Sequence, residues 1–345
     1  MPHRVWGRAG EALSVADPCV AELNIELPTA VYTEGSAIDA TVLAMADRDV
    51  VVTGGDVELV RNMSCRYRSW GGMGGSTTAT ARRSEVVDRS VFHSGGPLPG
   101  GQPLVQQVRL QVPPDGPGSV RAELLEISWA VHARLRTKGC RDAEATKHIL
   151  VLSEARECAA VAQSAPLVED RGCAVLGFES LSSRRLVGGL PLSGVLTVAP
   201  LRPVTARALR LDLVLLEHVA HGPWVTDDPA RSPANEEKDA ETLVASMALA
   251  GQSGRHRQVA PRSLGDWLTR IHHESSALLA SGGICIEGQQ RLRFPFRLIV
   301  PPRLQAPSVR TPDYSVRWML RGVLDWRLHA DPSVSLEMHA VTTHR

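Results

Sequence analysis

The residues with the clearest potential for chemistry are two adjacent histidines and a glutamate, His272, His273 and Glu274. Neighbouring side chains point to opposite faces of a strand, and on a helix they diverge by about 100°, so adjacent histidines seldom bind one metal. The chain has no H-E-x-x-H motif and no carboxylate at ligand spacing from this pair. We therefore expect no metal site.

Motifs of the common enzyme classes are absent from the chain. Neither G-x-S-x-G, G-x-x-x-x-G-K-[ST] nor a strand-linked G-x-G-x-x-G occurs. We therefore expect no catalytic residues, no cofactor and no enzymatic activity. A catalytic triad built from distant positions leaves no linear motif, so an enzyme stays a third alternative. A deep polar pocket with converging titratable groups would favour it.

Charge and hydropathy exclude two classes of partner. The formal net charge is +1, so no overall basic field points to nucleic acid. No apolar run reaches the ~18 residues of a membrane span, and residues 1–10 lack the apolar stretch of a secretory signal. We expect a cytoplasmic protein.

The cysteines show no metal-binding or redox spacing. All six are scattered, without a C-x-x-C pair. Reduced thiols are the expectation for a cytoplasmic protein, while a Cys158–Cys173 bridge stays an open alternative.

The elements that would position functional residues occur twice. Residues 108–114 and 296–302 each place an apolar side chain at every second position and end in Pro-Pro. Residues 127–135 and 316–324 again alternate, around a central Trp. Alternation is the period of a strand with one buried face, and Pro-Pro removes two backbone donors and ends the pairing. The two tryptophans, Trp129 and Trp318, are therefore expected in two separate cores.

The spacing of the two copies predicts the domain organisation. The offset is 154 residues at the early turn glycines, Gly35 and Gly189, and 189 residues at the tryptophans. Lobe two therefore carries an insertion, which its polar, Pro-rich composition places at about 222–262. Short alternating strands with Gly/Pro turns predict an all-β fold of two tandem antiparallel, immunoglobulin-like β-sandwiches. We expect an N-terminal extension (1–19), lobe one (20–155), a linker (156–172) and lobe two (173–345).

A glycine-rich tip in lobe one is the main candidate for partner binding. Trp70 and Met73 lie among the glycines of residues 71–75 and could insert into a partner's groove. Alternatively, Trp70 folds back onto its own sheet. Trp224 of the lobe-two insertion is a further candidate.

Four arginines, Arg66, Arg68, Arg82 and Arg83, flank this tip. Arginine can bind acidic or phosphorylated groups with two hydrogen bonds. Charged side chains also protect exposed strand edges from aggregation, and we favour that role for Arg82 and Arg83. Both roles stay open for Arg66 and Arg68.

Together these patterns resemble the arrestin superfamily, especially the bacterial arrestin-like sporulation-control proteins. The resemblance rests on the Gly turns, the 57–61 strand, the duplicated Pro-Pro strands and the Trp strand of 311–325. It covers residues 20 to 345 and implies two β-sandwich lobes acting as an adaptor. The segment Cys65–Met73 corresponds to the loop that this superfamily inserts into its partners. We cannot place a counterpart of the buried charged cluster of animal arrestins, so phosphate-driven activation is not implied.

We therefore predict a non-enzymatic cytoplasmic scaffold or adaptor. It would bind an unidentified protein partner through the tip of lobe one and the insertion of lobe two. It could also pair with itself through sheet edges. A β-sandwich that binds a small ligand or glycan is the alternative, and exposed aromatic residues converging on one sheet would favour it.

Overall fold

A computed structural model describes residues 21–341, apart from 71–75, 115, 154–164, 221–267, 287–289, 303, 305, 312 and 327–329. Regular structure in the described residues is β-strand throughout, without a helix. No helix in this part of the chain is therefore long and apolar enough to cross a membrane.

Lobe one is formed by the first ten strands. They are β1 (Ala21–Glu26), β2 (Val31–Thr33), β3 (Ala37–Ala46), β4 (Val50–Trp70), β5 (Ser76–His93), β6 (Gly96–Leu98), β7 (Leu104–Gln111), β8 (Val120–Arg121), β9 (Leu125–Lys138) and β10 (Ala143–Leu152). A small sheet has the order β1-β3-β7, and a large sheet has the order β2-β10-β9-β4-β5, with β6 on β4 and β8 on β9.

Lobe two repeats this arrangement with the remaining strands. They are β11 (Leu167–Glu169), β12 (Ala174–Glu179), β13 (Arg185–Val187), β14 (Pro191–Pro200), β15 (Val204–Val219), β16 (Leu268–Ile286), β17 (Leu292–Ile299), β18 (Val309–Arg310), β19 (Tyr314–Trp326) and β20 (Ser333–Val341). Its small sheet is β12-β14-β17, and its large sheet is β11-β20-β19-β15-β16, with β13 on β20 and β18 on β19. The predicted fold class, two tandem antiparallel sandwiches, is confirmed.

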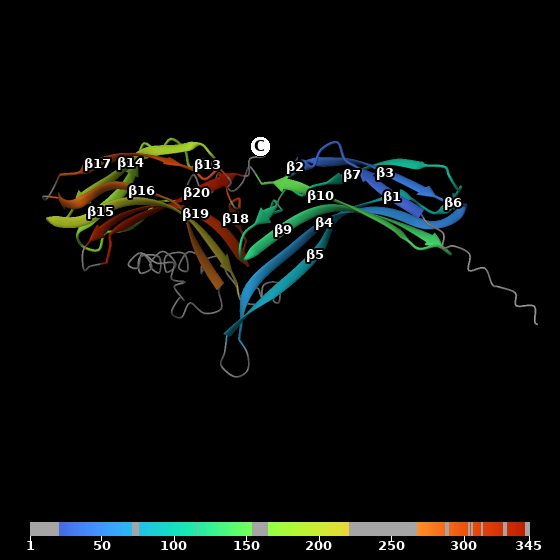
Figure 1. The fold of residues 1–345 in the computed structure, drawn as a ribbon, viewed down its shortest axis with the longest axis horizontal. Coiled ribbons are helices and arrows are strands. Elements are labelled where there is room, and N and C mark those ends of the chain that lie inside the picture. The colour runs from blue at the N-terminus through green and yellow to red at the C-terminus, as the bar shows by residue number, and fades with distance from the viewer. Residues whose placement is uncertain are drawn as a thin grey trace, which may run out of the picture.

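Figure 1 shows the two lobes side by side along the long axis of the molecule. Both small sheets lie on the upper side of this view, and both large sheets lie on the lower side. We call the face of a large sheet that turns away from its small sheet the outer face. Strands β4 and β5 run beyond the other strands of lobe one and reach down between the lobes.

The duplicated motifs occupy equivalent places in the two lobes. Gly35 and Gly189 both have positive φ, 74° and 78°, which glycine adopts without steric cost. Both turns pack against the second proline of a Pro-Pro pair, Pro114 in lobe one and Pro302 in lobe two. Each pair follows the end of an edge strand, β7 or β17, as the pattern predicted.

Each lobe buries one tryptophan on the inner face of its large sheet, which confirms the predicted cores. Trp129 is 1% exposed and Trp318 is 0% exposed. The Trp318 indole Nε1 donates to the Ala306 carbonyl at 2.9 Å. In lobe one, the Arg61 guanidinium lies instead over the Trp129 ring, 5.5 Å from its centre.

Two expectations need correction. The predicted linker, 156–172, includes β11, which pairs antiparallel with β20 of lobe two. The three residues between Pro166 and Asp170 are too few to signal a strand, and the hydrogen bonds of β11 come from a strand that is distant in the sequence. The expectation of reduced thiols is wrong at Cys140, which is disulfide-bonded. Cys173 is free, so a Cys158–Cys173 bridge does not form, and the cytoplasmic location stays a prediction.

The N-terminal extension and the lobe-two insertion lie outside the described residues.

Candidate partner-binding surface

The β4–β5 hairpin forms an arm that extends beyond lobe one. Pairing between β4 and β5 is continuous from Val60↔Val86 to Trp70↔Ser76, whereas β9 leaves β4 after Cys65. From Arg66 onward, β4 therefore has β5 as its strand neighbour. The arm carries the predicted tip at its end.

Three of the four predicted arginines share one face of this arm. Arg66 and Arg68 lie two residues apart on β4, and Arg82 lies directly opposite Ser64. Residues two apart on a strand, and residues directly opposite on neighbouring strands, point to the same face. Arg83 therefore points to the opposite face. Both Arg82 and Arg83 lie on the edge strand β5, and the roles of the four arginines stay predictions.

The base of this arginine group adjoins a shallow hollow of about 540 Å³. It is lined by Asn62, Met63, Ser64, Arg82, Arg83, Ser84, Glu126 and Ser128. Most of these side chains lie on the outer face, because Asn62 pairs with Ser84 and Ser128, and Ser64 pairs with Arg82 and Glu126. We name the arm face as the set Asn62, Ser64, Arg66, Arg68, Arg82, Ser84, Glu126 and Ser128. The hydrogen-bond donors of the arm face outnumber its single carboxylate, that of Glu126.

The structure says less about the predicted apolar binding residues, Trp70, Met73 and Trp224. Trp70 is the last residue of β4, and its backbone pairs with Ser76. Met73 and Trp224 lie outside the described residues. Insertion of these side chains into a partner stays a prediction.

A buried carboxylate joins the two lobes. Glu217 of β15 is 1% exposed. Its two carboxylate oxygens accept hydrogen bonds from the backbone amides of Glu123 and Leu124 in lobe one, at 3.0 and 2.5 Å. Charge-assisted hydrogen bonds of this kind offset the cost of burying a carboxylate.

Strand β16 completes this junction with two basic side chains. His272 Nε2 lies 2.9 Å from Glu217 and 3.7 Å from Glu123, and Arg270 Nε donates to Glu123 at 3.2 Å. The contact with Glu217 is the main cause that raises the pKa of His272, against the opposing effect of burial. Burial raises the pKa of Glu274 nearby. We name Glu123, Leu124, Glu217, Arg270 and His272 the lobe junction.

A second contact between lobes is mostly apolar. The Tyr314 hydroxyl of lobe two donates to Met63 Sδ of β4 at 3.8 Å, and both residues are buried. Burial raises the pKa of Tyr314 and of the neighbouring Cys65 to about 12, so both side chains stay neutral. The base of the arm is thus packed against lobe two.

Sequence reasoning did not find the lobe junction, although one signal for it was present. Glu217 follows the apolar run Leu213–Leu216, where a carboxylate needs a specific set of donors. The donors are backbone amides 93 and 94 residues away, which no side-chain pattern reveals.

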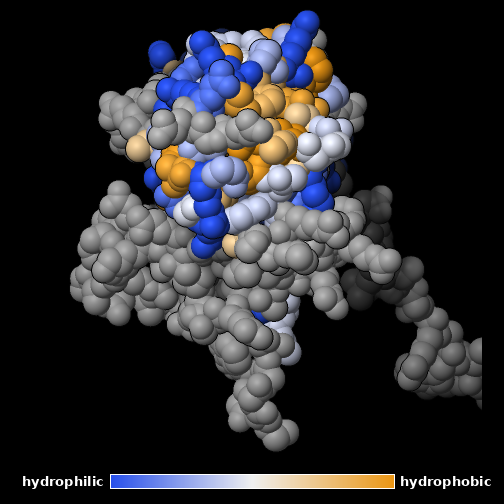
Figure 2. All heavy atoms as spheres, turned by 90° about the vertical axis from the view of Figure 1, so that its left-hand side faces the viewer, coloured by the Kyte–Doolittle hydropathy of each residue, from blue (hydrophilic) through white to orange (hydrophobic). Residues whose placement is uncertain are grey.

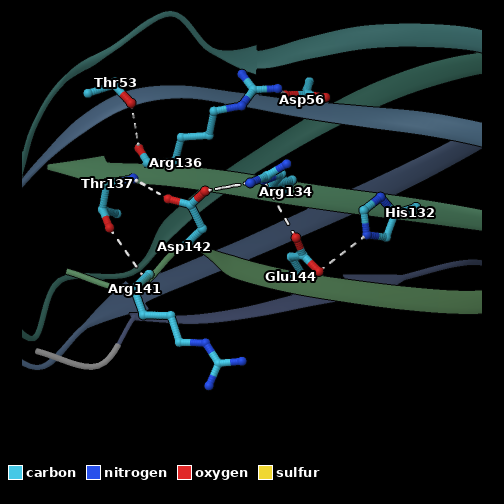
Figure 3. A network of polar contacts seen from close by, with 9 residues as sticks. All are labelled: Thr53, Asp56, His132, Arg134, Arg136, Thr137, Arg141, Asp142 and Glu144. Carbon is cyan, nitrogen blue, oxygen red and sulfur yellow. Dashed lines mark hydrogen bonds and ion pairs between the residues drawn. The ribbon is translucent and has the colours of Figure 1, made fainter. Parts of the chain in front are cut away.

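Figure 3 shows a polar network on the outer face of lobe one, where β4, β9 and β10 meet. Arg134 donates to Asp142 at 2.8 Å and lies 3.5 Å from Glu144, while Arg136 lies 2.5 Å from Asp56. Hydrogen bonding to Arg134 is the main cause that lowers the pKa of Asp142. These charges neutralise one another, and a carboxylate with a lowered pKa is a poor proton donor or acceptor near neutral pH.

A cleft of about 1010 Å³ lies beside this network, between β1 and the β9–β10 turn. Its described lining is Ala21, Glu22, Leu23, Asn24, Leu43, Ala44, Met45, Pro103, Arg134, Arg141, Asp142, Ala143 and Glu144. None of these side chains is aromatic, so the cleft lacks the stacking surface expected of a glycan site.

The histidine pair behaves as two separate residues. His272 belongs to the lobe junction, and His273 is its neighbour on β16, where adjacent side chains diverge. Within the part of the chain that the structure describes, no three His, Cys, Asp or Glu side chains cluster as a metal site would require.

Exposed apolar side chains occur on edge strands of lobe two. Leu278 of β16 is 63% exposed, and Val175 of β12 is 36% exposed. Figure 2 looks at the end of this lobe and shows apolar side chains gathered among charged ones. Pairing of two copies through sheet edges stays a prediction.

Neither a protein-family model nor a curated protein matches the chain. Among solved structures, the chain matches the crystal structure of Spo0M, a sporulation control protein from Bacillus subtilis. The match has 16% sequence identity and a TM-score of 0.34, and it covers 52% of this chain and 67% of that one. At this TM-score, the description of the fold rests on the strand pairing alone.

Proposed function

We propose that this protein is a non-enzymatic adaptor of arrestin-like type that binds an acidic segment of a partner protein on the arm face. The observation that carries the proposal is the placement of Arg66, Arg68 and Arg82 on one face of a projecting hairpin. A projecting element presents its side chains to a partner without displacing the sandwich core. Carboxylates are the groups that arginine pairs with most specifically.

The polar hollow supports the same proposal. Asn62, Ser64, Ser84 and Ser128 supply uncharged hydrogen-bonding groups beside the arginines. Such groups fix the orientation of a bound segment, whereas the charges mainly accelerate encounter and select the sign of the partner. The tip and the lobe-two insertion would add contacts around this centre.

An experiment with the full chain tests the proposal. Random peptides are selected from a displayed library, and the affinities of enriched peptides are measured by fluorescence anisotropy. Peptides rich in Asp and Glu are expected. The double variant Arg66→Glu/Arg82→Glu should weaken their binding at least about tenfold, and added salt should weaken it further, because exposed charge pairs are screened.

Arg297→Glu is the control, since Arg297 is also an exposed arginine on a strand but lies on β17, in the small sheet of lobe two. Its affinity should stay within about twofold of the wild type. Equal losses in both variants, or peptides without acidic preference, would show that the arm face is not the binding site.

A further inference from the structure

The arm has one strand edge without a neighbour. In the order β2-β10-β9-β4-β5, β5 comes last, so its second edge pairs with no strand among the described residues. Close to the sandwich this edge is occupied, because the Gln111 amide of β7 donates to Asp88 at 2.6 Å. Further out, the described residues show no backbone hydrogen bond to β5 other than those from β4. We name residues 77–86 the arm edge.

The arm edge lacks the features of the backbone that usually protect such an edge. Natural sheets block exposed edges with prolines, with bulges or by covering them. Residues 77–86 contain neither proline nor glycine, and both register shifts of this hairpin lie nearer to the sandwich, before Val60. The equivalent edge of lobe two is irregular, since β15 and β16 pair with three register shifts and β16 contains Gly282 and Gly283 at positive φ. The arm edge therefore offers a regular row of amides and carbonyls to a further strand.

Charge is the protective feature that the arm edge does have, and it determines which strand can bind. Arg82 and Arg83 are both exposed, and as consecutive residues of a strand they point to opposite faces of the hairpin. Within the described part of the chain, neither guanidinium forms an ion pair with a carboxylate. Pairing of two copies along this edge would add further arginines to the same sheet, whereas a strand with carboxylates compensates those present.

The pairing geometry fixes which residues of an added strand meet the two arginines. Directly opposite residues of adjacent strands share a face, with Cβ atoms about 5 Å apart. The residues opposite Arg82 and Arg83 are therefore consecutive in the added strand, one on each face. Two consecutive carboxylates satisfy both guanidiniums. Further along the arm edge, Thr77, Thr78 and Thr80 favour β-branched neighbours.

We propose that the acidic partner segment binds in extended form as an added strand on the arm edge, with two consecutive Asp or Glu residues opposite Arg82 and Arg83. This inference rests on the proposed function, to which it adds the conformation of the segment and its charge pattern. Backbone hydrogen bonds to β5 supply affinity, and the arginine pair supplies specificity. Arg82 belongs to both the arm face and the arm edge, so the two surfaces adjoin.

Backbone-methylated peptides test the added strand with the full chain. The parent peptide has ten residues, mostly Thr and Val, with a central Glu-Glu pair, and fluorescence anisotropy measures its affinity. Two derivatives carry N-methyl groups on the odd or on the even residues, which removes alternate amide donors and leaves the charges unchanged. Because alternate amides of a strand point to the same edge, one derivative should lose at least about tenfold in affinity. The other should stay within about threefold of the parent.

Charge variants add a second readout. Arg82→Glu and Arg83→Glu should each weaken binding of the parent peptide at least about fivefold, since each arginine meets one carboxylate. Arg297→Glu on β17 is the control and should change the affinity less than about twofold. A peptide with Glu-Thr-Glu in place of Glu-Glu keeps its charge but places both carboxylates on one face, so it should bind at least about threefold more weakly.

The outcomes separate this inference from the proposed function. Equal affinities of the two methylated derivatives, with a loss in Arg82→Glu but none in Arg83→Glu, would overturn the added strand and leave binding on the arm face intact. A dimer in analytical ultracentrifugation that Arg83→Glu dissociates would show that a second copy occupies the arm edge, and would also overturn it. Equal binding of acidic and uncharged peptides would contradict the proposed function, and this inference with it.

Discussion

The outer faces of the two large sheets rest on equivalent strands but carry different chemistry. In lobe one, Glu58 lies opposite His132, and Arg89, which is half exposed, pairs with Glu58 at 3.5 Å. In lobe two, the corresponding positions hold Asp212 opposite Arg321, and both are buried. At this pair of positions, lobe one therefore exposes its charged groups to solvent, while lobe two encloses them.

The apolar residues differ in the same way. Lobe two has a separate buried cluster on its outer face, formed by Val214, Leu216 and Met319. At the repeat offsets, Leu216 corresponds to Asn62, which is exposed and belongs to the arm face. The two lobes thus share their strand order and the position of their inner core, but they differ in the residues of their outer faces. Three measurements test this contrast between the two lobes.

The largest effect is expected from Asp212→Ala. Arg321 is 2% exposed, and burial already lowers its pKa, so loss of Asp212 removes the largest of the carboxylate effects that offset this burial. The free energy of unfolding should fall by about 3–5 kcal/mol. Glu58→Ala, the matched change in lobe one, should cost less than about 1 kcal/mol, since Arg89 reaches solvent. Urea denaturation measures both, and equal costs would contradict the contrast between the faces.

Leu216→Ala comes next. Leu216 is 1% exposed, and truncation of a buried leucine creates a cavity, so we expect a loss of about 3 kcal/mol. Asn62→Ala at the matched position should change stability by less than about 0.5 kcal/mol. Thermal and chemical denaturation of both variants provide the readout. A small cost for Leu216→Ala would mean that this cluster is not tightly packed in solution.

The smallest of the three effects is a pH dependence that should distinguish His218 from Ser64, its counterpart in lobe one. Burial is the main cause that lowers the pKa of His218 to about 4, with a smaller effect from Arg317. The folded-state pKa lies below the unfolded value of about 6.5, so its stability contribution is complete above pH 6.5 and is lost as pH falls towards 4. At pH 5 the loss should be about 2 kcal/mol.

The variant His218→Ser reproduces lobe one and should remove this part of the pH dependence. Other titrating groups, including His272 with its raised pKa, are common to both proteins and cancel in the difference between the two stability curves. Parallel curves for wild type and variant between pH 7 and 5 would contradict the assignment to His218.

Much of the fold could be predicted from the sequence, because alternation, turn glycines and Pro-Pro pairs act locally. Trp129 and Trp318 were placed in separate cores by these patterns alone, and the structure buries both. The short strand β11 could not be predicted, since its partner strand β20 lies more than 160 residues away. The arm face shows the same limit. Whether Arg82 or Arg83 joins Arg66 depends on the register between β4 and β5, which no single strand specifies.

The lobe junction has a consequence for how mutations act on it. The Glu217 carboxylate is held by main-chain amides of Glu123 and Leu124, not by their side chains. Nearly any residue at positions 123 and 124 would keep those two donors, and only proline would delete one. Lobe two, by contrast, has a single side chain in this role. Amino-acid substitutions can therefore remove these hydrogen bonds chiefly at position 217.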